Sequence, residues 1–240
     1  MNANGFEKLH GIDEMDEKQV LTLCRTAEWL TRQKLSGTIE LYRPVKVQTG
    51  RTPRQTGARR IRRTNVMKRI GILGAGTWGM ALARMLTVSG NDVLVWSAIE
   101  KEIDSLSTTR KHPNLPQMKI PDELRFTKSI EEVCKDKDIL LFAVPSVFVR
   151  STAAKARPYV ADGQIIVDVA KGIEPDTLYT MTEILADELG KEGGPKGVRL
   201  VALSGPTHAE EVAIDLPTTI VSASKDMKAA AYVQEVFTNN

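Results

Sequence analysis

The residues whose types and spacing most clearly suggest chemistry form a glycine-rich segment, Gly74-Ala75-Gly76-Thr77-Trp78-Gly79. This segment follows an apolar run typical of a buried strand (69–73) and opens a segment predicted to be helical (77–89). Gly74 permits a tight turn, Gly76 lets a pyrophosphate approach the backbone, and Gly79 lets the helix pack on the strand. Free N–H groups at a helix start attract phosphate. The pattern predicts a dinucleotide site; the alternative is a glycine-rich turn without function.

The end of the second predicted strand (92–96) bears on which dinucleotide would bind. A carboxylate there would hold the ribose hydroxyls of NAD, whereas an Arg would hold the extra phosphate of NADP. Trp96 is followed by Ser97 and Ala98, and the nearest acid, Glu100, comes late. The cofactor is therefore expected to be NAD or NADP, and the preference between them stays open.

Two further motifs directly follow predicted strands, where open α/β sheets bind ligands. In Val144-Pro145-Ser146-Val147-Phe148, the ring of Phe148 could pack on a cofactor, but the residues alone favour packing in the core. In Lys171-Gly172-Ile173-Glu174, the Lys171 ammonium could reach a phosphate or carbonyl as a compact charge. A solvated surface lysine is an equally good interpretation of Lys171, so both remain open.

The fourth motif runs from Ser204 to Glu211. Thr207 and Glu210 have the spacing of a capping box, which predicts a helix starting at Thr207. Gly205 would leave the backbone open beside that helix start, which predicts a small phosphate site. The alternative is a plain helix cap, and the neighbouring His208 is interpreted as structural.

Strand-like and helix-like segments alternate from Met67 to the end of the chain, which predicts an α/β fold with a doubly wound, mostly parallel sheet. The apolar run 138–144 is typical of a strand covered on both faces. The other predicted elements are strands at 165–169, 199–203 and 218–223 and helices at 130–135, 176–189 and 225–237.

Composition is that of an ordinary globular chain, with 42% hydrophobic and 26% charged residues among 240. No apolar stretch approaches the roughly 20 residues of a membrane span. Cys24 and Cys134 have no metal-site spacing and fit a reduced cytosolic chain, so neither a metal site nor a disulfide is expected.

Residues 1–66 differ from the rest in charge, with 13 Lys and Arg against 7 Asp and Glu. Helical spacing of apolar residues predicts one helix within 1–37, and six arginines predict a linker at 51–63. A nucleic-acid arm is the alternative, but the arginine-rich stretch lacks aromatic residues for base stacking. We interpret 1–66 as an N-terminal extension, not native to the working protein, and 67–240 as the domain.

Taken together, the four motifs resemble the bacterial-type NAD(P)-dependent glycerol-3-phosphate dehydrogenases. The matching segments are GILGAGTWGMALA (71–83), FAVPSVFVR (142–150), VAKGIEPDTL (169–178) and LSGPTHAEEV (203–212). The resemblance implies a Rossmann domain over 67–240 that belongs to an oxidoreductase. This enzyme would interconvert sn-glycerol 3-phosphate and dihydroxyacetone phosphate for glycerophospholipid synthesis.

The resemblance also implies roles for individual residues. The cofactor-binding residues would be Gly74, Gly76, Thr77, Trp78, Gly79, His112, Phe148, Lys171 and Ala209. The substrate-binding residues would be Lys171, Gly205 and Thr207. Ala98 stands where bacterial members often carry Arg or His, which leaves the NADP contact unassigned.

The family's helical C-terminal domain, with its general-base Lys, is expected beyond Asn240, so no catalytic residue is assigned here. The chain alone is expected to bind cofactor and turn over little. A cytoplasmic location, a phosphorylated small-molecule substrate, no nucleic acid and a homodimer in the full-length enzyme complete the expectations. The alternatives are another 3-hydroxyacid-type dehydrogenase and a non-catalytic dinucleotide-binding module.

Overall fold

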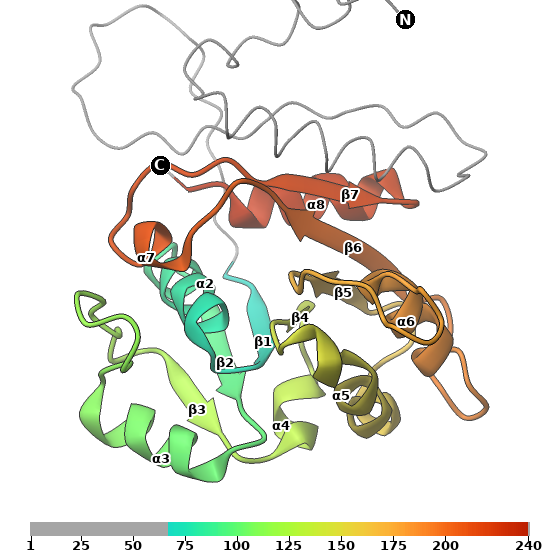
Figure 1. Cartoon of the computed structure of the whole chain (residues 1–240), viewed down its shortest axis with the longest axis horizontal. Helices are drawn as coiled ribbons and strands as arrows, with labels where there is room; N and C mark the ends of the chain where they lie inside the picture. The colour runs from blue at the N-terminus through green and yellow to red at the C-terminus, as the bar shows by residue number, and fades with distance from the viewer. Residues whose placement is uncertain (1–66, 240) are drawn as a thin grey trace, which may run out of the picture.

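The computed structural model describes residues 67–239 (Figure 1). The helix predicted within 1–37 and the arginine-rich linker predicted at 51–63 lie outside the described residues. Among the described residues, no helix combines the length and apolar character that crossing a membrane requires.

A seven-stranded sheet with the order β3-β2-β1-β4-β5-β6-β7 forms the centre of the fold. Six strands are parallel, and only β7 runs antiparallel to its neighbour β6. The predicted mostly parallel, doubly wound sheet is therefore confirmed. The strands are β1 (Arg69–Leu73), β2 (Asp92–Trp96), β3 (Arg125–Thr127), β4 (Ile139–Phe142), β5 (Ile165–Asp168), β6 (Arg199–Ser204) and β7 (Val221–Ser224).

Helices cover both faces of this sheet, with α2, α3, α7 and α8 packed on one face and α4, α5 and α6 on the other. Figure 1 shows α5 and α6 on one side of the central strands and α2 and α7 close together on the other. The helices are α2 (Thr77–Val88), α3 (Glu100–Thr109), α4 (Ile130–Cys134), α5 (Val149–Ala156), α6 (Met181–Leu189), α7 (Ala209–Val212) and α8 (Met227–Phe237), with short 3-10 turns η3 (Ser146–Phe148) and η4 (Arg157–Tyr159).

The apolar run of β4 is explained by these two layers. Ile139 and Leu141 face the cluster that contains α2, whereas Leu140 and Phe142 face the cluster that contains α5, and all four are fully buried. A strand covered on both faces needs apolar residues at every position, because neither side meets water.

Several element boundaries differ from the sequence prediction. The helix predicted over 176–189 begins only at Met181, because Leu178 has a φ of 58° and Ile173 forms a β-bridge with Thr180. Thr180 caps α6 through a capping box with Glu183. The sequence prediction also lacked α3, β3 and α5, which are short or bury few apolar side chains.

The strand order locates the ligand side of the sheet. Strand order reverses between β1 and β4, because the chain builds outward from β1 toward β3 and then returns to add β4 on the other side. Ligands of open α/β sheets bind in the crevice beyond the carboxyl ends of the strands at such a switch point. The loops after β1 and β4 are therefore the starting point for a search for the functional site.

Candidate functional site

The loop after β1 fits tightly between the ends of β2 and β4. Gly74 has a φ of 124°, which favours glycine, and its N–H donates to Trp96 O at 2.8 Å. A Cβ at Gly74 would lie 2.6 Å from Ala143 O, and a Cβ at Gly79 would lie 2.2 Å from Gly74 O. Gly74 and Gly79 are thus required by the packing of this loop, as the sequence predicted.

Gly76 has a different environment, because a Cβ there would meet no heavy atom within 4 Å. It is the N-cap of α2, and no side chain caps this helix, which lies wholly within the described residues. The first-turn N–H groups of α2, beginning at Thr77, are therefore open to an anion. Trp78 is partly buried and packs against the core cluster on the α2 face.

His112 belongs to a segment that lies on this glycine loop. Its Nδ1 accepts from Asn114 N at 3.2 Å, and the Asn114 side-chain amide donates to Thr77 Oγ1 at 3.2 Å. His112 is buried, and this burial lowers its pKa below the usual 6.5. Burial thus favours the neutral form of His112, which lies beside the start of α2.

The second motif leaves the core after Val144. Val147 and Phe148 in η3 are 75% and 56% exposed, and the chain is buried again only at Val149. The interpretation of Phe148 as a core residue is therefore wrong. The ring is free to contact a ligand because η3 turns it outward at the carboxyl edge of the sheet.

The third and fourth motifs meet at the same edge. Lys171 follows β5, Gly205 follows β6, and Lys171 Nζ donates to Gly205 O at 3.4 Å. A Cβ at Gly172 would lie 2.9 Å from Ser146 Cβ, so the third motif also contacts the second. The tertiary structure thus brings together three segments that are well separated in the sequence.

The fourth motif differs from its predicted geometry in two ways. The helix α7 begins at Ala209 with His208 as N-cap and no side-chain cap, so the capping box of Thr207 and Glu210 is wrong. The backbone at Gly205 is not open, because a Cβ there would lie 2.4 Å from Thr219 O. Gly205 is thus required by the close approach of the segment before β7, a contact that local spacing could not reveal.

Ala209 lies on the α2 side of this edge. It is partly buried against the same core cluster as Trp78, and α7 packs on α2. Thr207 is partly buried in the turn that joins Gly205 to α7. The sequence-predicted site residues therefore line one continuous edge, from the glycine loop and α7 to η3 and Lys171.

The sequence interpretation missed Asp168, the last residue of β5. It is 6% exposed, and its Oδ1 accepts from Ala170 N at 3.1 Å, directly before Lys171. Burial raises the pKa of Asp168 to about 7. The signal was present as the only polar residue in the apolar run 165–170, but burial on both faces of β5 became evident only in the fold.

It also missed Glu102, whose carboxylate contacts the residue after β2. Ser97 Oγ donates to Glu102 Oε2 at 2.5 Å and accepts from Ile99 N at 3.1 Å. Glu102 lies in the first turn of α3, a helix that the pattern did not predict. The carboxylate that contacts Ser97 thus comes from α3 and not from the strand end.

An ion pair ties the turn that follows α7 to the helix α2. Arg84 of α2 donates to both carboxylate oxygens of Asp215 at 2.7 and 2.8 Å, and this contact lowers the Asp215 pKa. Asp215 has a φ of 62°, which asparagine also tolerates.

We expect Asp215→Asn to lower the free energy of unfolding at pH 7 by about 0.5–1.5 kcal/mol, a modest effect since Asp215 is half exposed. A depressed carboxyl pKa stabilises the fold above the unfolded value of 3.8, and this contribution is lost as the pH falls through the folded value. Urea denaturation should therefore show a smaller difference in the free energy of unfolding between the wild type and Asp215→Asn at pH 3.5 than at pH 7. An equal difference at both pH values would contradict the ion-pair explanation.

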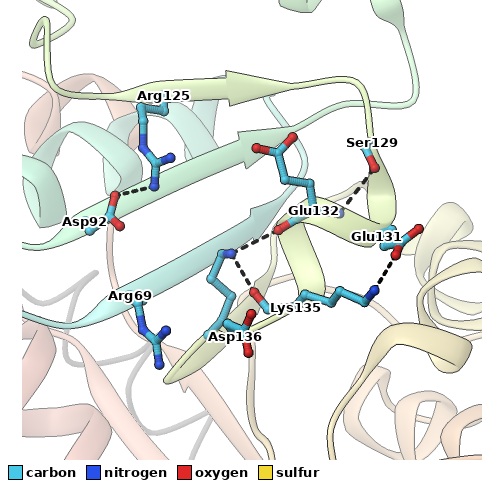
Figure 2. Close-up of a pocket in the computed structure, with 9 residues that line it drawn as sticks. Arg69, Asp92, Arg125, Ser129, Glu131, Glu132, Lys135 and Asp136 are labelled. Carbon is cyan, nitrogen blue, oxygen red and sulfur yellow. Dashed lines mark hydrogen bonds and ion pairs between the residues drawn. The ribbon is translucent and has the colours of Figure 1, made fainter.

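A polar hollow lies elsewhere, beside the first residues of three strands, Arg69, Asp92 and Arg125 (Figure 2). Two ion pairs lie in its lining: Arg125 binds Asp92 at 2.6 Å and Lys135 pairs with Glu131. Since this is the amino edge of the sheet, opposite the switch-point crevice, the hollow is not the candidate site.

The comparison with known protein families decides between the remaining interpretations. Residues 69–230 match the family model described as NAD-dependent glycerol-3-phosphate dehydrogenase N-terminus. The chain belongs to this family. The family resemblance inferred from the four motifs is thereby confirmed.

Individual relatives agree with this assignment. The chain is 67% identical over 173 residues to glycerol-3-phosphate dehydrogenase (NAD(P)+) 2 of Lactobacillus delbrueckii subsp. bulgaricus, covering 72% of this chain and 51% of that one. It is 47% identical to the Agathobacter rectalis enzyme, covering 72% and 50%. The crystal structure of glycerol-3-phosphate dehydrogenase from Coxiella burnetii matches with a TM-score of 0.64 at 28% identity, covering 72% and 52%. The chain thus spans about half the length of the relatives it matches.

Proposed function

We propose that this chain is the cofactor-binding part of an oxidoreductase that interconverts sn-glycerol 3-phosphate and dihydroxyacetone phosphate with NAD(H) or NADP(H), for glycerophospholipid synthesis. The observation that supports this proposal most strongly is that Lys171 and Gly205 meet at the sheet edge that also holds the open start of α2. A glycine loop by itself would support only dinucleotide binding.

The division of roles follows the geometry. The open N–H groups after Gly76 would hold the pyrophosphate, with His112 and Phe148 beside the cofactor. Lys171 would contact both cofactor and substrate, and it supplies the full positive charge for the substrate phosphate. The further cofactor residues are Gly74, Thr77, Trp78, Gly79 and Ala209, and the further substrate residues are Gly205 and Thr207.

The reaction needs both a hydride carrier and a base. Bound NAD(P)(H) carries the hydride, whereas oxidation of the alcohol also requires a positioned base to remove its proton. The site residues described here bind and orient, and we place the general base, a Lys in this family, in the part of the enzyme that this chain does not match. The matched part would therefore bind the cofactor, and turnover would also need this general base.

The remaining assignments are proposals on the same basis. Residues 67–240 would form one domain, and 1–66 an extension that the fold does not need. The protein would be cytoplasmic, would not bind nucleic acid, and would form a homodimer as the full-length enzyme.

The substrate half of the proposal predicts a selective effect of Lys171→Ala. In the NADH-saturated chain, this change should lower the affinity for dihydroxyacetone phosphate about tenfold to a hundredfold, because a charge-assisted hydrogen bond contributes roughly 1.5–3 kcal/mol. The affinity for NADH alone, measured by titration calorimetry, should change much less.

Two controls make this test specific. Lys155→Ala removes an exposed lysine on α5, away from the edge, and should leave both affinities unchanged. Unphosphorylated dihydroxyacetone should be much less sensitive to Lys171→Ala. If Lys171→Ala lowers the affinities for the phosphorylated and the unphosphorylated ligand equally, Lys171 does not bind the phosphate. The interpretation of Lys171 as a surface lysine would then hold.

A further inference from the structure

An ion-pair cluster behind the candidate site is centred on Arg150, in the first turn of α5. Arg150 Nε and Nη2 donate to the two carboxylate oxygens of Glu174, each at 2.7 Å. Its Nη1 pairs with Asp187 of α6 and lies 3.5 Å from Glu188 Oε2. One guanidinium thus joins two elements of the fold: the loop between β5 and α6, through Glu174, and the helix α6, through Asp187.

Glu174 is the central residue of that loop. Its N–H donates to Tyr179 O and its carbonyl accepts from Leu178 N, both at 2.9 Å. Thr177 Oγ1 donates to Glu174 Oε2 at 2.5 Å, so the carboxylate is held from inside the loop as well as from Arg150. These contacts, with that of Arg150 the largest, lower the pKa of Glu174 to about 2, and the pair therefore remains ionised at any pH near neutrality.

The same loop begins with Lys171 and Gly172. Gly172 has a φ of 149° and lies against Ser146 of η3, which directly precedes α5, the helix that carries Arg150. The loop thus contacts the η3–α5 segment at two points, Gly172 on Ser146 and Glu174 on Arg150. Lys171 precedes both points and reaches across to Gly205.

We propose that Arg150 and Glu174 are positioning residues, whose ion pair holds the β5–α6 loop so that Lys171 reaches the substrate side of the site. Neither residue touches a ligand in this arrangement; both act through Lys171. This inference rests on the proposed function for its consequence in binding, but its structural content concerns the order of the loop and can be tested separately.

Asp187 provides a matched control because it binds the same guanidinium from outside the loop. A merely stabilising role of Arg150 predicts that Glu174→Gln and Asp187→Asn have similar consequences. A positioning role predicts that only Glu174→Gln affects the loop and Lys171. Both changes are isosteric and remove one negative charge. They weaken different contacts of Arg150, and Glu174→Gln also changes the group that accepts from Thr177 Oγ1.

The first arm of the test is hydrogen exchange of the full chain, followed by mass spectrometry of peptides covering 172–179. We expect Glu174→Gln to accelerate exchange there about tenfold, and Asp187→Asn to leave it unchanged. Equal acceleration in both variants, or none in Glu174→Gln, would overturn the positioning role, whatever ligand the chain binds.

The second arm measures the affinity for dihydroxyacetone phosphate in the NADH-saturated chain. Glu174→Gln should lower this affinity about fivefold to twentyfold. In a Lys171→Ala background the same change should lower the affinity by less than a further factor of about two. ADP-ribose, which needs only the glycine loop, should bind all variants alike. A full effect of Glu174→Gln in the absence of Lys171 would show that Glu174 does not act through Lys171. If Lys171→Ala alone has no effect on this ligand, the proposed substrate role fails, and the exchange arm still decides whether the pair orders the loop.

Discussion

We expect Gly76→Val to weaken NADH and NADPH binding by at least about a hundredfold while the fold is retained. A branched side chain at this position would occupy the open space in front of the first turn of α2, where we place the pyrophosphate. Losing two hydrogen bonds to a charged phosphate costs roughly 3–6 kcal/mol, which corresponds to at least two orders of magnitude in affinity. Titration calorimetry on both proteins measures the loss.

The matched variant is Gly79→Ala, which adds a smaller side chain to the same loop. Its Cβ would lie 2.2 Å from Gly74 O and 3.1 Å from Ala143 Cβ, so the loop must shift or the helix must move from the strand. We expect a loss of about 3 kcal/mol in the free energy of unfolding, or failure to fold, whereas Gly76→Val should change stability by less than about 1 kcal/mol. If Gly76→Val binds dinucleotide normally, the glycine loop is not the cofactor site.

Asp168→Asn is expected to stabilise the protein above pH 7 and to matter little near pH 4. Burial raises the folded pKa of Asp168 from 3.8 to about 7. Between these values the folded state binds a proton that the unfolded state has released, so the wild type loses stability as the pH rises through this window. At about 1.36 kcal/mol per pKa unit the full cost is at most about 4 kcal/mol, and we expect about 1–3 kcal/mol because buried sites are partly solvated.

Denaturant unfolding from pH 4.5 to pH 8 measures this effect. Asn retains an oxygen that can accept from Ala170 N, so the variant changes the ionisation and leaves the hydrogen bond possible. Asp176→Asn, at an exposed position in the next loop, controls for the general effect of removing a negative charge. Parallel stability curves for the wild type and Asp168→Asn would show that Asp168 does not titrate in this window.

The elements around the glycine loop could be predicted because their signals are local. The strand 69–73 matches β1, and the boundaries of α2 and β2 agree to within one residue, since apolar periodicity and glycine spacing act within a few neighbouring residues. The same holds for the roles of Gly74 and Gly79, whose contacts follow from a strand, a tight turn and a helix in succession. The four motifs together were specific enough to predict the family.

Boundaries set by distant contacts were predicted less well. The helix α6 starts at Met181 because the loop before it folds on itself and binds Arg150, although the spacing from 176 onward is helical. The helix α7 starts at Ala209, after a turn in which Gly205 lies against Thr219 of the segment before β7. In both places a tertiary contact outweighed a local propensity of a few tenths of a kcal/mol per residue.

The sequence by itself determined where the candidate site residues lie along the chain: the glycine loop, Lys171 and the segment 204–209 each follow a predicted strand. Only the tertiary structure decided that Lys171 meets Gly205, that Phe148 is exposed and that Asp168 is buried. The reason is that strand order and the distant contacts of a loop are global properties of the sheet. Residues 34 positions apart, such as Lys171 and Gly205, become neighbours only when β5 and β6 pair in register.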